Sequence, residues 1–288
     1  MTAEPMAFLN LAVIGVTLYL TWRGFEDPSF SDRLLFSTDE ILRHRQYYRV
    51  LTSGFIHADW PHVLFNLFSL YSFGRYIELL FGPVTFALIY FSGIIGGSLL
   101  ALLLHRNESY RSLGASGGVC GVIFASIFLL PGGSISIFPV PIAIPSYLYA
   151  ILFIVASAIG SRGRIGNVGH DAHLGGALIG LGTATAMYPY IVRESPVLYA
   201  VVVALSAGLL LWLYWRTETV SFGAVARRGL FQRDPSSEAD TKARQRQADD
   251  RTMDQLLEKI SRNGMEALTD REKSQLADLS RKKRGPGR

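Results

Sequence analysis

Long apolar stretches, separated by short polar segments, occupy the first three quarters of the chain. Each of seven stretches approaches the roughly 20 residues that an α-helix needs to cross the apolar core of a bilayer. The seven predicted spans are Met6–Trp22, His62–Phe81, Pro83–Leu104, Gly114–Pro131, Ile142–Gly160, His173–Val192 and Pro196–Trp215. The pattern therefore predicts an all-α, polytopic transmembrane helical bundle.

Glycines recur at three- and four-residue spacing in the third, fourth and sixth predicted helices. This spacing lets helix backbones approach closely, which is how helices associate inside a membrane. The glycines are Gly93, Gly96, Gly97, Gly114, Gly117, Gly118, Gly121, Gly175, Gly176, Gly180 and Gly182. We therefore expect the fourth and sixth helices to touch.

The segments outside the apolar helices differ in character. Arg23–Trp60 mixes apolar runs with charges, which predicts a structured loop at the membrane interface. Ser221–Asp249 is polar and low in aliphatic residues, so it predicts a flexible linker. Beyond it, apolar residues at helical spacing and a capping box at Thr269–Glu272 predict two short helices. The expected units are a first helix with the start of its loop (residues 1–44), a core (45–192), a seventh helix (193–216), the linker (217–249) and a short soluble helical-hairpin tail (250–288).

Composition and charge agree with a membrane protein. Hydrophobic residues make up 49% of the 288 residues, charged residues 18%, and the mean hydropathy is +0.26. No charged residue occurs from Ser112 to Ser161, a tract that a bilayer can bury and a globular domain cannot. The net charge of +5 does not indicate nucleic acid binding, because 17 of the 28 Lys and Arg residues follow Trp215. The single cysteine, Cys120, excludes an intramolecular disulfide framework.

A serine and a histidine stand at the starts of two predicted helices. Ser116 lies in Gly114–Gly117, where the unpaired amides of a helix N-terminus could stabilise an oxyanion as its hydroxyl attacks a carbonyl. Small-residue helix packing is the other interpretation of this motif. His173 is ionisable within a membrane segment, which favours a functional role. Because one helix intervenes, both residues lie at the same membrane face, where His173 could act as general base and acid.

Two further polar side chains begin the second predicted helix at that face. His62 and Asn66 are four residues apart, so they share one side of the helix and are candidate oxyanion donors. The alternative is a polar pair that holds helices together. We interpret the nearby His57 as structural.

The residues around His173 allow two other hypotheses. His170, Asp171 and His173 could bind a metal ion, but no Glu or further His follows at a suitable spacing, so neither a metal nor another cofactor is expected. Asp171 could complete a Ser-His-Asp triad. Residues two apart on a helix point in different directions, which argues against this triad.

These residues, taken together, resemble the rhomboid family of intramembrane serine proteases. The resemblance extends from about Arg45 to Tyr188. The matching pieces are Tyr48-Arg49, His57, His62-x3-Asn66, Glu78, Gly114-x-Ser116-Gly and Ala172-His173-x2-Gly176-x3-Gly180. The resemblance implies a bundle of the rhomboid type, with a six-helix core and one added C-terminal helix.

The resemblance also implies roles for the four candidate site residues. Ser116 would be the nucleophile of a Ser–His dyad, and His173 its general base and acid. His62 and Asn66 would join the Ser116 amide in the oxyanion hole.

Other positions match or depart from the family pattern. Arg49 and Glu78 match positions that shape the first loop and its helix contacts. Tyr48 stands where a tryptophan often precedes the arginine, and Cys120 replaces an aromatic residue that packs on the histidine in many relatives. We expect another residue, such as Phe124, to hold the ring of His173.

The leading functional prediction is an intramembrane serine endopeptidase that cleaves transmembrane segments of membrane proteins. The alternatives are a non-catalytic rhomboid-like protein that binds membrane helices and a transporter, which would show internal repeats and interrupted helices. The expected partners are transmembrane protein substrates and the lipid bilayer, and the oligomeric state is left open. The expected location is the cell (plasma or inner) membrane.

Two arguments about membrane orientation disagree. The resemblance implies a cytosolic N-terminus and a Ser116 site that opens to the outer face, which places nine arginines in the short outer loops and two in the inner segments. The positive-inside rule favours the inverted arrangement. Because the arginines of the first loop could be paired within a folded element, we expect the outward-facing site.

Overall fold

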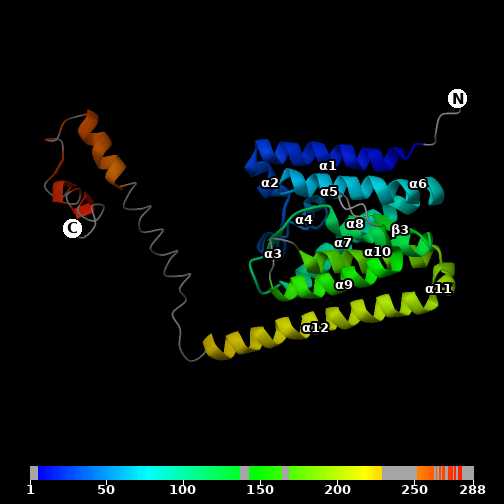
Figure 1. The fold of residues 1–288 in the computed structure, drawn as a ribbon. Helices are drawn as coiled ribbons and strands as arrows, with labels where there is room; N and C mark the ends of the chain where they lie inside the picture. Colours follow the sequence, from blue (N-terminus) through cyan, green and yellow to red (C-terminus); the bar gives the residue numbers. More distant parts are fainter. Residues whose placement is uncertain are drawn as a thin grey trace. The chain divides into compact units, whose positions relative to one another are not determined.

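The computed structural model describes residues 6–136, 143–163, 169–228, 252–262 and parts of 264–280. The chain divides into two units, Met1–Ser221 and Phe222–Arg288. The first unit is a bundle of helices (Figure 1). The predicted all-α fold class is confirmed.

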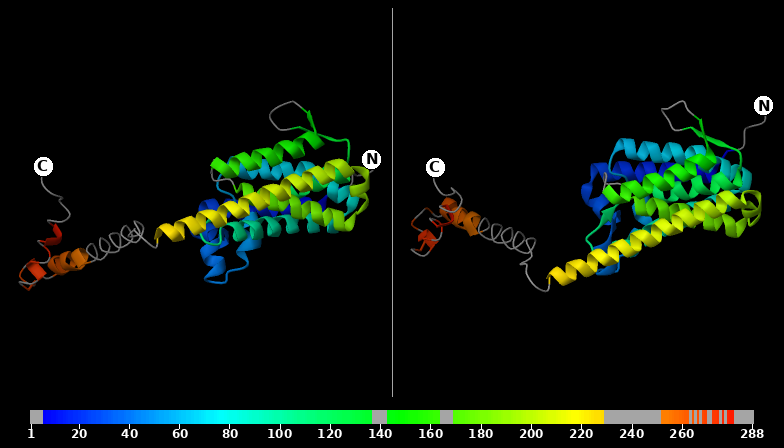
Figure 2. Two further views of the ribbon diagram at one scale, coloured as in Figure 1. Left: turned by 90° about the horizontal axis from the view of Figure 1, so that it is seen from below. Right: turned by 60° about the horizontal axis from the view of Figure 1, so that its bottom comes forward.

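Each of the seven predicted spans corresponds to a helical segment. They are α1 (Phe8–Glu26), α5 and α6 (Trp60–Ser69 and Arg75–Phe81) joined by the π-helical turn η2 (Leu70–Gly74), α7 (Pro83–Leu104), α8 (Ser116–Leu129), α9 (Ser146–Gly163), α10 (His170–Met187) and α12 (Pro196–Arg228). Among the described residues, three helices are long and apolar enough to cross a membrane: Phe8–Glu26, Pro83–Leu104 and Pro196–Trp215. The last of these lies along the outside of the bundle (Figure 2).

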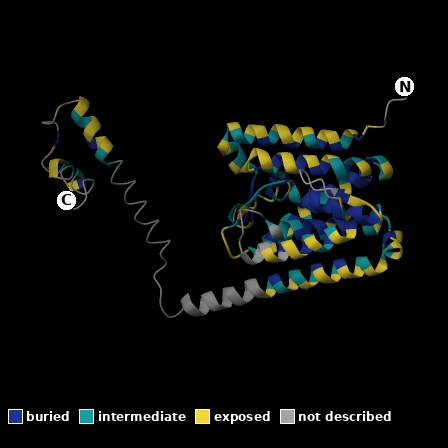
Figure 3. Cartoon of the chain, in the orientation of Figure 1, coloured by how far each residue is buried: buried dark blue, intermediate teal, exposed yellow. Residues whose placement is uncertain are grey.

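Helix α8 is shorter than predicted and lies inside the bundle. It begins at Ser116 instead of Gly114, because Gly114 has a φ of +134°, which a right-handed helix does not allow. Its 14 residues span about 21 Å, less than the roughly 30 Å of a bilayer core. Every residue after Ser116 is buried (Figure 3), and α8 packs against α7 and α10. Protein, rather than lipid, therefore surrounds α8.

The predicted fifth helix begins later than expected. Residues of its predicted start form strand β4 (Ala143–Pro145), which pairs antiparallel with β3 (Ser134–Ser136). This hairpin projects from the bundle (Figure 2), and α9 follows it from Ser146.

The predicted sixth helix ends earlier than expected. Helix α10 stops at Met187 and does not continue to Val192. Tyr188 precedes Pro189 and takes a non-helical conformation, because a following proline disfavours the helical backbone. The short helix α11 (Tyr190–Glu194) then leads into α12.

The segment between α1 and α5 is folded, as predicted. It contains α2 (Pro28–Leu34), β1 (Phe36–Ser37), α3 (Thr38–Leu42), α4 (Arg49–Thr52) and the 3-10 turn η1 (Ser53–Phe55), and β1 pairs with β2 (Arg111–Ser112). The buried guanidinium of Arg49 donates hydrogen bonds to the carbonyls of Asp32 and Leu35. Arg49 therefore holds this loop together, as the resemblance implied.

Glu78 of α6 attaches the first helix to the bundle. Its buried carboxylate accepts hydrogen bonds from the amides of Leu9 (2.9 Å) and Asn10 (2.6 Å), in the first turn of α1. Such amides lack helical partners and favour a negative charge. The Asn10 side chain in turn donates to the carbonyl of Leu70. One end of α1 is thus bonded to both α6 and η2.

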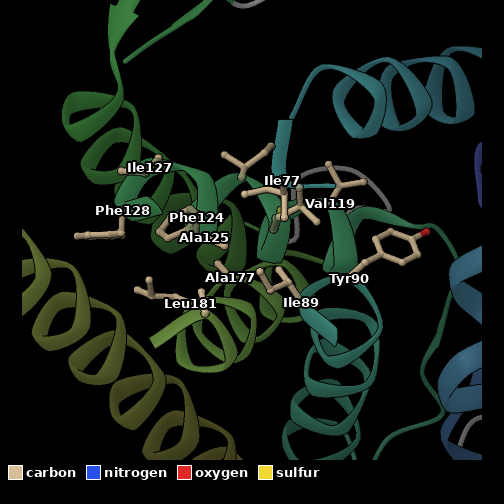
Figure 4. Packing of buried hydrophobic residues seen from close by; sticks show 14 of the residues in the cluster. Ile77, Ile89, Tyr90, Val119, Phe124, Ala125, Ile127, Phe128, Ala177 and Leu181 are labelled. Carbon is tan, nitrogen blue, oxygen red and sulfur yellow. The ribbon is translucent and has the colours of Figure 1, made fainter. Parts of the chain in front are cut away.

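Glycines mark the closest approach of α8 and α10, as predicted. A β-carbon on Gly176 would collide with the backbone of Gly117, and one on Gly180 would collide with Gly121. Gly182 has open space around it and takes no part in this contact. Apolar side chains pack around the helices, and Figure 4 labels Ile77, Ile89, Tyr90, Val119, Phe124, Ala125, Ile127, Phe128, Ala177 and Leu181.

The tail unit contains the predicted capping box. The amide of Thr269 donates to the Glu272 carboxylate (2.8 Å), and the amide of Glu272 donates to the Thr269 hydroxyl (3.3 Å). Hydrogen bonds from Lys259 and from Thr269 lower the pKa of Glu272 to about 2. Helix α12 continues to Arg228, past the expected start of the linker, and the rest of the predicted linker lies outside the described residues.

Candidate active site

Ser116 is the first residue of α8 and follows a tight turn at Gly114. A β-carbon on Gly114 would lie 2.9 Å from the ring of His62, and its φ of +134° also requires glycine. Ala115 precedes the helix and provides no side-chain cap. The first amides of α8 therefore lack intrahelical partners close to the serine hydroxyl.

His173 is in hydrogen-bond contact with Ser116. The distance between His173 Nε2 and Ser116 Oγ is 2.7 Å. His173 lies in the first turn of α10, which begins at His170 and not at His173 as expected. One turn further along, Gly176 packs on the backbone of Gly117. This close packing brings the two helix starts together.

The role of His173 as a base requires one direction of this hydrogen bond, with the Ser116 hydroxyl as the donor. A hydroxyl that donates to Nε2 requires that nitrogen to be unprotonated, so a neutral ring carries its proton on Nδ1. The ring of Phe153 lies beside His173, with centroids 6.5 Å apart. Phe124, which we expected to hold the histidine, packs on Phe153 with centroids 5.2 Å apart. Phe124 thus supports the ring that contacts His173.

His62 and Asn66 lie close to the dyad. Asp59 caps α5 by accepting a hydrogen bond from the amide of His62 (2.8 Å). The amide side chain of Asn66 donates to the carbonyl of His62 (2.9 Å). Both residues line a cavity of about 700 Å³ together with Ser116 and His173. The structure therefore brings all four predicted site residues to one cavity.

This cavity runs along α8, between α5 and η2 on one side and α9 and β3 on the other. Its walls are mainly apolar, and its described lining contains no Asp, Glu, Lys or Arg side chain. A second cavity, of about 360 Å³, reaches Ser116 and His173 from the first loop. Its lining is more polar and includes Ser53, Asp59 and Ser98. The dyad therefore lies where a strongly apolar cavity meets a more polar one.

His57 contacts the backbone beside Ser116. Its Nε2 accepts a hydrogen bond from the amide of Ala115 (3.1 Å), and its Nδ1 lies 3.0 Å from the Thr21 hydroxyl. Burial, together with the neighbouring His62, lowers the pKa of His57 to about 3. The ring is therefore neutral at pH 7. Sequence reasoning missed this contact, because His57 and Ala115 are 58 residues apart and no local pattern joins them.

Asp171 is paired with a histidine that the sequence did not single out. Its Oδ2 lies 2.6 Å from Nε2 of His105, directly after α7. The His105 ring also stacks on Tyr110, with centroids 4.0 Å apart. The His170 side chain, part of the metal hypothesis, lies outside the described residues. Within the described part of the chain, no group of three or more His, Cys, Asp or Glu residues could hold a metal ion.

Two family models match the chain. One, described as "Rhomboid domain", matches residues 44–190, which is 147 of the 288 residues and includes all four predicted site residues. The other, described as "Family of unknown function (DUF6576)", matches residues 240–282 in the tail. Helix α1 lies outside both matches.

The chain is similar to several rhomboid-like proteins. It is 29% identical to RHOMBOID-like protein 12, mitochondrial, of Arabidopsis thaliana over 188 residues, which cover 59% of this chain and 55% of that protein. It is 38% identical to Inactive RHOMBOID-like protein 8 of the same plant over 88 residues (30% of this chain and 25% of that protein). It is 25% identical to Rhomboid protease GluP of Bacillus subtilis over 149 residues (52% and 28%). The chain thus spans about half or less of the length of these relatives.

Proposed function

The chain belongs to the rhomboid family, and from this premise we propose that it is an intramembrane serine endopeptidase that cleaves transmembrane segments of other membrane proteins. Its Rhomboid domain and its long apolar helices make it an integral membrane protein. The observation that carries the proposal is the 2.7 Å contact between Ser116 Oγ and His173 Nε2. A nucleophile within hydrogen-bond reach of a base is what this reaction requires.

In the proposed acylation step, Ser116 Oγ attacks the carbonyl carbon of the scissile peptide bond, and its proton passes to His173 Nε2. The carbonyl electrons move onto oxygen, and the amide of Ser116 with the side chains of His62 and Asn66 would donate to this oxyanion. His173 then gives its proton to the leaving amine as the carbon–nitrogen bond breaks. The product is an ester between the substrate and Ser116.

Water completes the proposed reaction. His173 takes a proton from a water molecule that attacks the ester, and the proton returns to Ser116 Oγ as the carboxylic acid product leaves. The second, more polar cavity beside the dyad supports this step, because it extends from Asp59 of the first loop to Ser116 and has room for water.

The apolar cavity supports a membrane-borne substrate. A peptide bond within a helix has its amide and carbonyl paired, so a substrate helix must unwind locally before it is cut. Residues that weaken helices would therefore be favoured near the cleavage site. A cavity of about 700 Å³ without charged side chains in its described lining fits a short, unwound and uncharged segment.

A second candidate function is that of a non-catalytic rhomboid-like protein that binds membrane helices. The identity of 38% to a relative named inactive favours this candidate. The close contact of Ser116 with His173 favours the protease.

Fluorophosphonate labelling of detergent-purified protein tests the proposal. We expect the wild-type protein to be labelled and to cleave a transmembrane substrate, and Ser116→Ala to do neither. Ser206→Ala, which removes a buried serine of α12, serves as the matched control and should be labelled like the wild type. A folded wild-type protein that is neither labelled nor active would favour the non-catalytic candidate.

We also propose that the protein resides in the cell (plasma or inner) membrane. The similar plant protein named as mitochondrial makes an organellar membrane the competing outcome. Membrane fractionation of the source cells would distinguish the two.

A further inference from the structure

The backbone turn before Ser116 is held by groups of the first loop. The amide of Ala115 donates to Nε2 of His57 (3.1 Å), and the amide of Gly114 donates to the carbonyl of Ser53 (2.9 Å). These bonds orient the peptide units that lead into α8. The Ser116 amide, the proposed backbone donor to the oxyanion, follows these two peptide units directly in the sequence.

The contacts of His57 define a single arrangement of protons. A backbone amide can only donate, so Nε2 of His57 must be its unprotonated nitrogen. A neutral ring then carries its proton on Nδ1, 3.0 Å from the hydroxyl oxygen of Thr21. The Thr21 hydroxyl in turn donates to the carbonyl of Phe55 (3.3 Å). The chain of hydrogen bonds runs in one direction, from Ala115 through His57 and Thr21 to Phe55.

The surroundings of this chain of hydrogen bonds protect it from water and from protonation. His57 is 3% exposed and Thr21 is fully buried, so water has little access to either group. The titratable group that packs on the His57 ring is His62, with ring centroids 4.9 Å apart. Burial also holds the pKa of His57 near 3, so the ring remains neutral and able to accept at neutral pH.

We propose that His57 and Thr21 are positioning residues, which together hold the turn before Ser116 so that its amide is aimed at the oxyanion. This inference rests on the proposed protease function. Thr21 belongs to α1, which lies outside the residues that match the Rhomboid domain. The first helix thus contributes to the geometry of the site as well as to anchoring the bundle.

Two matched threonine variants test the positioning role. Thr21→Val keeps the shape of the side chain and removes the hydroxyl, which leaves Nδ1–H of His57 without its acceptor. Thr17→Val makes the same change one turn earlier on α1, at an equally buried position that no hydrogen bond links to His57 within the described residues. We expect Thr21→Val to lower kcat about tenfold, the equivalent of one lost hydrogen bond, with little change in KM. Thr17→Val should leave kcat unchanged. Thr21→Ser, which keeps the hydroxyl, should have a kcat close to that of the wild type.

The outcomes separate this inference from the proposed function. An active wild-type protein with an unchanged kcat in Thr21→Val would overturn the positioning role alone. A wild-type protein that neither reacts with fluorophosphonate nor cleaves substrate would overturn the protease function and the positioning role with it. Equal losses of kcat in Thr21→Val and Thr17→Val would show a general effect on packing and would also contradict the positioning role.

A spectroscopic measurement tests the hydrogen-bond chain without using activity. In protein labelled with ¹⁵N-histidine, the His57 signals are identified by their loss in His57→Gln. We expect the wild-type ring to be neutral with its proton on Nδ1. A ring protonated on Nε2 could not accept the Ala115 amide and would overturn the proposal.

Discussion

His105 and Asp171 form a hydrogen-bonded pair that joins the end of α7 to the first turn of α10, with Nε2 and Oδ2 2.6 Å apart. Burial acts to lower the pKa of His105, but Asp171 and Glu108 together outweigh it and raise the pKa above its ordinary value of 6.5. The pair is therefore ionic over a wider pH range than a free histidine would allow. Asp171 lies two residues before His173, so the pair supports the start of α10.

Asp171→Asn is expected to keep proteolytic activity and to lower stability by roughly 1.5–3 kcal/mol, the range for hydrogen bonds to charged groups. A histidine with a raised folded-state pKa contributes stability that is fully present below its unfolded pKa and is lost as pH rises through the folded pKa. The wild-type Tm should thus fall as pH rises through the folded-state pKa of His105, and the Tm of Asp171→Asn should fall less, because only Glu108 then remains beside the ring. The measurement is Tm against pH. A loss of activity as large as that of His173→Ala, in a folded protein, would support the triad instead.

Ser116→Ala and His173→Ala should each lower kcat by about 10⁶-fold, as removal of either group does in a soluble serine protease. Because the two act as a unit, the double variant should be no worse than either single variant. Steady-state cleavage of a reconstituted transmembrane substrate is the measurement. Substantial cleavage by purified Ser116→Ala would contradict the mechanism.

Asn66→Ala and His62→Ala should reduce kcat on the order of 10²–10³-fold, the usual cost of losing one oxyanion donor. Since these donors act mainly on the charged intermediate, KM should change little. The kinetics need the same reconstituted substrate. An unchanged kcat in both variants would mean that the two residues only hold helices together.

Gly176→Ala should destabilise the bundle by roughly 1–3 kcal/mol, because its β-carbon would meet the backbone of Gly117, which cannot rotate away. Gly182→Ala is the matched control on the same helix, where the added carbon meets no atom within 4 Å. Thermal unfolding in detergent compares the two variants. An equal Tm for Gly176→Ala and Gly182→Ala would show that α8 and α10 can move apart without a loss of stability.

Reporter fusions after Arg111 and after Arg233 test the predicted orientation. With an outward-facing site and seven spans, both reporters should lie on the outer side. A cytosolic signal after Arg111 would establish the inverted arrangement favoured by the positive-inside rule. Reporters on opposite sides would mean that Pro196–Trp215 does not span.

The seven helices were predictable because their apolar stretches are long, and their ends were less so. The Ser116 helix begins where Gly114 adopts a positive φ, and α10 ends before Pro189; these are effects of single residues rather than of periodicity. The β3–β4 hairpin was not predicted, because its strands are three residues long and lie beside apolar helices.

The site was predictable where residues head helices and not where they bridge distant segments. The parity of the spans correctly placed Ser116 and His173 together. The partners of His57 are Thr21, 36 residues away, and Ala115, 58 residues away, and no spacing rule connects such positions. The sequence likewise predicted Phe124 of α8 beside His173, whereas the ring found there is Phe153 of α9.

The enclosure of α8 has a consequence for how the protein responds to different membranes. Hydrophobic mismatch acts on helices that contact lipid, which tilt or distort when the bilayer becomes thinner or thicker. A helix of 14 residues that is surrounded by protein is affected by hydrophobic mismatch only through the helices that pack against it. The surrounding helices, and not the lipid headgroups, therefore determine the depth of Ser116 in the membrane. If the proposed function holds, bilayers of different thickness should shift where a substrate helix rests against the protein, and hence which of its peptide bonds reaches Ser116.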